Sequence, residues 1–198
     1  MKKGFTLLEL LIVIGILAIL STTMILVINP AELLKKARDS QRLSDFGTLK
    51  SAIAFYLTNA STYSIGSTGQ TYADIGAVTC FGTASPTASS TYLYVNGSGW
   101  IPINFTSLSI GSPISSLPRD PNQSTASTGN HYYVYGVKST SDLTFKLVTN
   151  MESLAYSSSG PSDAESKDGG TNTGLYERGT DLTLTITTGA NCFNSVAP

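Results

Sequence analysis

A run of 22 residues without a charged side chain, from Leu10 to Ala31, is the strongest constraint on the fold of this 198-residue chain. As an α-helix the run would rise about 33 Å, enough to cross a hydrocarbon core of about 30 Å. The run is longer than the apolar stretch of an ordinary secretory signal and does not end in an A-x-A-like cleavage site. Lys2 and Lys3 precede it, and basic residues prefer the cytoplasmic side. We expect a single membrane anchor with a cytoplasmic N-terminus and everything after Pro30 on the other side.

Charge is distributed unevenly along the chain. The first fifty residues hold seven basic and four acidic side chains, and the remainder holds five basic and nine acidic ones. The corresponding net charges of +3 and -4 predict a membrane-associated N-terminus followed by a mildly acidic soluble domain. A pI near 5.7 also disfavours a nucleic-acid-binding protein of the usual basic kind.

Glu9 interrupts the apolar pattern at the edge of this run. An ionised carboxylate in the middle of such a helix costs roughly 2.5 to 3.5 kcal/mol on insertion scales. We therefore expect Glu9 to have a partner, which is a backbone amine, another chain, or water at the membrane interface.

The segment KKGFTLLELLIVI, residues 2–14, resembles the processing signal of type IV prepilins and of the related pseudopilins of type II secretion. The resemblance implies that a prepilin peptidase removes a leader at residues 1–4 by cutting between Gly4 and Phe5. It also implies N-methylation of Phe5 and makes Glu9 the family's acidic assembly position. Cleavage creates an α-amine at Phe5, and in a filament this cation of an arriving subunit would pair with Glu9 of an assembled one.

The sequence predicts one long helix from about Phe5 to Leu57 that breaks near Pro30. Residues 5–30 would form its transmembrane and filament-core half, and residues 31–58 its amphipathic continuation. Asn29 fits an N-cap and Pro30 the first helical position of the second half. In that half an apolar stripe is expected to be buried against a sheet, with the charged side chains mostly elsewhere; a partner-binding coiled coil is the alternative. The stripe comprises Leu43, Phe46, Leu49, Ile53 and Tyr56 or Leu57.

Residues 59–198 are expected to form a globular head. Its strand candidates are a hairpin of Tyr92–Val95 and Trp100–Ile103 around Asn96-Gly97, then His131–Val137, Leu143–Val148 and Asp181–Thr187. The fold class predicted from these elements is α+β and pilin-like, with a long N-terminal α-helix packed on a small antiparallel β-sheet of four or five strands.

The segment from Leu117 to Asn122 precedes one of these strands and is similar to a segment of major pseudopilins and some bacterial pilins. Its two prolines push their predecessors into extended conformations. We expect this segment to be a rigid connection into the sheet.

The two cysteines, Cys80 and Cys192, lie in the part predicted to be outside the membrane, where disulfides persist. A bridge between them is expected. No Cys-x-x-Cys spacing supports a metal or thiol-catalytic site.

Asp163, Glu165 and Asp168 lie near a Gly-rich turn and are weak candidates for Ca²⁺ ligands, although their spacing does not match an EF-hand loop. Major pseudopilins carry calcium in a C-terminal loop, but a solvated acidic loop is the preferred interpretation. We expect no cofactor and no catalytic residue. His131 is the only histidine, and no nucleophile elbow or phosphate-binding loop occurs.

The predicted function is a structural subunit of a type IV pilus-like filament. The expected partners are further copies in a helical filament, prepilin peptidase, the inner-membrane assembly machinery and, before assembly, membrane lipid. The protein would be a single-pass cytoplasmic-membrane precursor and then part of an extracellular filament. The alternatives are a type II secretion pseudopilin, a competence pilin for DNA uptake, and, from another class, a single-anchor membrane enzyme or ligand-binding protein. The -4 charge of the distal part disfavours DNA binding.

Overall fold

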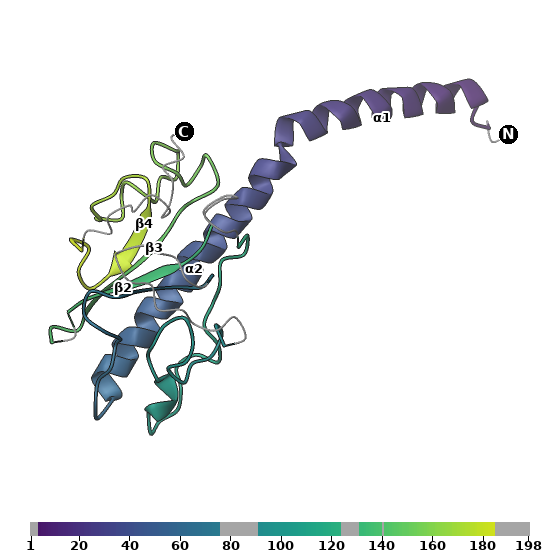
Figure 1. The fold of residues 1–198 in the computed structure, drawn as a ribbon. Coiled ribbons are helices and arrows are strands. Elements are labelled where there is room, and N and C mark those ends of the chain that lie inside the picture. Colours follow the sequence, from purple (N-terminus) through teal and green to yellow (C-terminus); the bar gives the residue numbers. More distant parts are fainter. Residues whose placement is uncertain (1–3, 76–90, 124–130, 140, 185–198) are drawn as a thin grey trace.

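The computed structural model describes residues 4–75, 91–123, 131–139 and 141–184. Two helices come first: α1, Leu7–Ile28, and α2, Pro30–Asn59. Figure 1 shows α1 projecting away from the rest of the chain, while α2 runs along the sheet of the head. The head is therefore built on α2 alone.

The two helices are separated by a single residue, Asn29, in the left-handed conformation with φ 44° and ψ 77°. The residue before a proline is pushed out of the right-handed helical region, so Pro30 explains why the break falls at Asn29. The Asn29 side chain caps α2 by accepting a hydrogen bond from the Glu32 amide at 3.4 Å. Asn-Pro thus ends one helix and begins the next, at an angle to it (Figure 1).

The sheet has four antiparallel strands in the order β1-β2-β3-β4. The strands are β1 Thr71–Ala73, β2 Val134–Ser139, β3 Thr144–Thr149 and β4 Tyr176–Gly179. The predicted α+β, pilin-like fold class is confirmed. Strands β2 and β3 overlap the predicted strands, whereas β1, of three residues, was not predicted.

The hairpin predicted around Asn96-Gly97 was wrong. Between residues 91 and 105 the structure has only an isolated bridge between Asn96 and Asn104. The Asn96 side chain accepts hydrogen bonds from the amide and the hydroxyl of Ser98, at 3.1 and 2.6 Å. This Asx turn replaces the two-residue hairpin turn, so the flanking residues do not align as strands.

The last strand also differs from its prediction. Residues 181–184 form a turn in which Asp181 accepts a hydrogen bond from the Thr183 amide at 2.9 Å, and residues 185–187 lie outside the described part. The strand beside β3 is β4, which begins at Tyr176, five residues before Asp181. The hydrogen bond between the Asp181 side chain and the Thr183 amide favours a turn here, although the alternating apolar residues after Asp181 predicted a strand.

The core lies between α2 and the sheet. Phe46, Leu49 and Ile53 are fully buried there, and the ring of Phe46 meets Tyr133 edge-on at a centroid distance of 5.0 Å. The predicted apolar stripe is therefore the helix face that packs on the sheet. Its continuation toward Pro30 was not predicted: Asp39 and Arg42 lie on the same face and are fully buried. The expectation that the charged side chains would avoid this face was wrong for these two residues.

Candidate functional site

Helix α1 packs against no other element from Leu7 to Met24 in the described part of the chain. Its segment from Leu7 to Met24 has a mean hydropathy of 2.4, and none of it is buried. By length and composition it can cross a membrane. A surface of this kind requires lipid or another protein around it.

The start of α1 is closed by a capping box between Thr6 and Glu9. The Thr6 amide and hydroxyl both donate to Oε2 of Glu9, at 2.9 and 2.7 Å, and the Glu9 amide donates to Oγ1 of Thr6 at 3.2 Å. Glu9 thus has partners within its own chain, and this cap was not predicted. The signal was available in the Thr-x-x-Glu spacing of residues 6 to 9.

The Gly4-Phe5 peptide bond lies outside the helix. Residues 4 to 6 are exposed and without regular structure, and the Phe5 side chain is 74% exposed. No heavy atom lies within 4 Å of the point where a Cβ on Gly4 would be. A protease could therefore reach this bond without unwinding α1, and a new α-amine at Phe5 would lie four residues before Glu9.

Comparison with protein families agrees with this geometry. Residues 1–25 match the family model described as prokaryotic N-terminal methylation motif. The chain carries a prepilin-type cleavage and methylation signal. The signal indicates a type IV pilin-like or pseudopilin precursor, a class of structural subunits, and the family resemblance predicted from the sequence is confirmed. No curated protein and no solved structure matches the chain.

A buried charged cluster fastens the head to α2. The Arg42 guanidinium donates to both carboxylate oxygens of Asp120 at 2.7 Å, to Asp39 at 2.6 Å and to Glu152. Arg38 also binds Glu152, at 2.6 Å. Three carboxylates thus converge on one fully buried cation, and the second arginine reduces the excess negative charge.

Carboxylates in and beside this cluster also accept hydrogen bonds from the backbone amides of two loops. Asp39 accepts from the amides of Glu152 and Ser153, at 3.0 and 2.8 Å. The Asp120 amide donates to Asp74 at 2.9 Å. Since Asp120 belongs to the segment Leu117–Asn122, that segment joins α2 through its carboxylate and β1's end through its amide.

The pKa shifts of this cluster follow from burial and pairing. Burial alone would lower the pKa of Arg42, but hydrogen bonds to Asp120 and Glu152 outweigh it and raise the pKa above its ordinary value. Burial would raise the pKa of Glu152, but Arg38 and Arg42 lower it to about 2. Burial raises the pKa of Asp74 to about 7 against the opposing effect of two amide donors. At neutral pH the arginines and Glu152 are therefore charged.

The three calcium candidates are engaged by neighbouring backbone amides. Asp163 accepts from Ser166 at 3.0 Å, Glu165 from Met151 at 2.9 Å, and Asp168 from Gly170 at 2.7 Å. Within residues 4–75, 91–123, 131–139 and 141–184, no group of three His, Cys, Asp or Glu side chains could hold a metal ion. These carboxylates shape the turns of residues 151–170.

The two cysteines, Cys80 and Cys192, lie outside the described residues. The segments that lead toward them start close together. Ile75 and Leu184 both pack against one small cluster on the sheet, which includes Val134 and Val148. His131, three residues before β2, is half-buried, and burial lowers its pKa.

Proposed function

We propose that the chain is a structural subunit of a type IV pilus-like filament, stored in the cytoplasmic membrane and polymerised through α1. The observation that carries this proposal is the exposed apolar segment Leu7–Met24 of α1, which lies within a prepilin-type processing signal and just after its cleavage site. Prepilin peptidase would act on the exposed bond between Gly4 and Phe5 and release residues 1–4. Inner-membrane assembly machinery would then move α1 from lipid into an extracellular filament.

Glu9 would change partners during assembly. In the membrane its carboxylate is held by the amide and hydroxyl of Thr6, which reduces the cost of placing it at the edge of an apolar helix. In the filament the methylated Phe5 amine of an arriving subunit would add a cation to this arrangement. A charge-assisted bond is stronger than a neutral one, so the pairing would favour assembly and set the axial register.

The nearest alternative is a pseudopilin of a type II secretion system, which would share each of these steps. The resemblance of Leu117–Asn122 to a pseudopilin segment favours it, and the bond between Asp120 and Arg42 gives this segment a structural role in either case. Filament length in sheared surface material separates the two: long fibres support a pilus, and their absence from the surface supports the secretion filament.

The first test changes Gly4 to valine. A β-branched side chain next to the cleaved bond should block the peptidase, because the bond needs an extended, unhindered backbone. N-terminal sequencing should then find Met1 rather than Phe5 at the start of the chain. A mature Phe5 terminus in Gly4→Val would contradict the assigned cleavage site.

The second test separates charge from capping at Glu9. Glu9→Gln keeps the capping box, since glutamine serves at this position, but removes the charge; Thr6→Ala removes the cap and keeps the charge. We expect Glu9→Gln to be processed but not assembled, and Thr6→Ala to assemble. Fibres of normal yield from Glu9→Gln would refute pairing with the amine.

We further propose a disulfide between Cys80 and Cys192. Ile75 lies five residues before Cys80 and Leu184 eight residues before Cys192, and both pack on the same cluster. At about 3.3 Å per extended residue, chains of these lengths can meet without moving the sheet. Such a bridge would fasten the C-terminal segment to the segment after β1.

A further inference from the structure

Three exposed leucines lie at the end of the head from which α1 departs. Leu33 and Leu34 belong to the first turns of α2 and are 58% and 61% exposed, and Leu154 belongs to a loop of the head and is 73% exposed. The Leu154 amide donates to Oε1 of Glu32 at 2.7 Å, so this loop lies against the same turns of α2. Together with two lysines these leucines form what we call the α1-proximal rim: Leu33, Leu34, Lys35, Lys36 and Leu154.

The loop of the rim is held in place by more than one hydrogen bond. The amide before that of Leu154 belongs to Ser153 and donates to Asp39 of α2 at 2.8 Å. Ser153 and Ala155 are buried, whereas Leu154 between them is exposed. Single exposed leucines are common on protein surfaces, but three around the start of one helix form an apolar patch that favours a partner.

The two lysines give the rim a positive charge. Among the residues that the structure describes, neither Lys35 nor Lys36 forms an ion pair, whereas Arg38, in the next turn, pairs with Glu152 at 2.6 Å. Lys35 and Leu154 line the same hollow in the surface, so basic and apolar side chains lie side by side. With Glu32 counted, residues 31–36 carry a net charge of +1. Lysine stems are long and flexible, so both charges can reach an anionic surface beside the leucines.

The rim lies just beyond the segment that can cross a membrane. Its α2 residues follow Pro30 by three to six positions, a rise of about 5 to 9 Å along the helix. The polar headgroups extend about 5 to 8 Å beyond each side of the hydrocarbon core. Figure 1 shows α1 leaving from this end of α2. With α1 across a bilayer, the rim therefore lies at the level of the headgroups.

We propose that the α1-proximal rim docks on anionic phospholipid headgroups of the membrane that α1 crosses. The proposal rests on the proposed function and goes beyond it by giving the head its own lipid contact before assembly. The leucines enter the boundary between headgroups and acyl chains, and the lysines meet the phosphates. Apolar and basic side chains on one surface are the pattern by which proteins bind in the membrane interface.

The test is photo-cross-linking of the full-length chain in vesicles. A diazirine amino acid replaces Leu154 or, as the matched control, Ile110, which is 64% exposed. Ile110 follows Phe105, whose ring packs on Tyr56 near the other end of α2 at a centroid distance of 5.8 Å. The vesicles contain phosphatidylcholine alone or mixed with phosphatidylglycerol, and adducts are identified by intact mass. We expect lipid adducts at position 154 and not at position 110, with the higher yield in the mixed vesicles.

The lysines are tested in the same assay. Each lysine near an anionic surface strengthens binding by about fivefold. Lys35→Gln combined with Lys36→Gln should therefore lower the lipid adduct at position 154 severalfold in the mixed vesicles. Lys50→Gln is the control, because Lys50 is exposed farther along α2, and it should leave the yield unchanged.

A probe at Ile16 of α1 separates this proposal from the proposed function. Lipid adducts at position 16 with none at position 154 would overturn the docking and leave the membrane anchor intact. Adducts of position 154 with a second copy of the chain in place of lipid, or equal yields with and without phosphatidylglycerol, would also overturn it. Absence of lipid adducts at position 16 would show that α1 does not enter the bilayer and would overturn both proposals.

Discussion

Arg42 shows how a single residue can determine the geometry of this head. Its side chain is fully buried and binds carboxylates that lie 78 and 110 residues away in the sequence, in Asp120 and Glu152. Removing one partner from such a cluster leaves a buried charge uncompensated, which costs more than the intact cluster contributes. The cluster therefore fixes which loops lie beside the N-terminal half of α2.

Glu152 should give the head a measurable dependence on acid. Its pKa in the folded chain is about 2, below the ordinary 4.5. A lowered pKa stabilises the fold above pH 4.5, and this contribution disappears as pH falls toward 2; at neutral pH it is on the order of 3 kcal/mol. In urea unfolding followed by the fluorescence of buried Trp100, Glu152→Gln should be less stable than wild type at pH 7, and the difference should narrow below pH 4.5. A difference that does not change between pH 7 and pH 2.5 would contradict the assigned charge pairing.

At the scale of elements, the features that could be predicted from the sequence are those set by residues adjacent in the chain. The charge-free run predicted α1, and Asn29-Pro30 predicted the break that follows it. The pairing of Arg42 could not be predicted, because its partners come from distant loops. The hairpin prediction failed for a different reason: the Asn96 side chain accepts a hydrogen bond from the Ser98 amide and forms an Asx turn in place of the hairpin turn.

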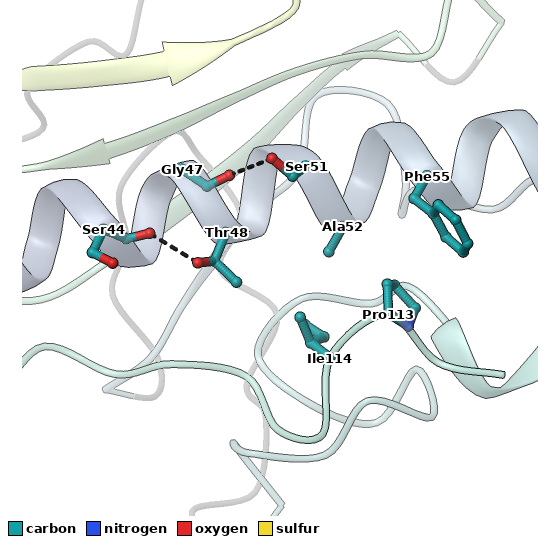
Figure 2. A pocket seen from close by; sticks show the side chains of 8 residues that line it. All are labelled: Ser44, Gly47, Thr48, Ser51, Ala52, Phe55, Pro113 and Ile114. Atoms are coloured by element: carbon teal, nitrogen blue, oxygen red, sulfur yellow. Dashed lines mark hydrogen bonds between the residues drawn. The ribbon is translucent and has the colours of Figure 1, made fainter.

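The same distinction between local and long-range features applies to the candidate site. Gly4, Phe5 and Glu9 could be proposed from the sequence because a processing signal is a contiguous string of residues. The Thr6 cap was equally local and was not predicted. The approach of Pro113 and Ile114 to α2 (Figure 2) could not be predicted, because it arises only through the fold.

The bend between α1 and α2 should depend on Pro30. Pro30→Ala restores a backbone donor and removes the steric restriction on Asn29, so the two helices should merge into one. Spin labels at Ser21 and Ser51 would then move apart toward about 45 Å, the rise of 30 helical residues. Asn29→Gly is the control and should keep the wild-type distance, because glycine adopts φ 44° readily. Equal distances in Pro30→Ala and wild type would show that the proline does not cause the bend.

At the scale of the whole molecule, the proposed bridge between Cys80 and Cys192 would close a loop of roughly 110 residues around the sheet. On the loop-entropy model it stabilises the fold by up to about 4 to 5 kcal/mol. Alkylation under denaturing conditions should add no label to the filament subunit before reduction and two labels after it, and reduction should lower the unfolding midpoint. Two labels without reductant would rule the bridge out.

The molecule as a whole combines two parts of opposite character. Helix α1 is apolar and exposed from Leu7 to Met24, whereas the head contains buried ion pairs, in the Arg42 cluster and between Lys146 and Glu177. A subunit built in this way would be stable as a head on a membrane anchor, with lipid around α1 before assembly and other subunits around it afterwards. Cleavage before Phe5 is the step that would commit it to assembly.

The most direct measurement is therefore the intact mass of the chain in sheared surface filaments, viewed by electron microscopy in the same preparation. We expect fibres whose subunit begins at Phe5 and carries one added methyl group. A chain that begins at Met1 and is recovered as a monomer from the membrane, with no fibres, would contradict it.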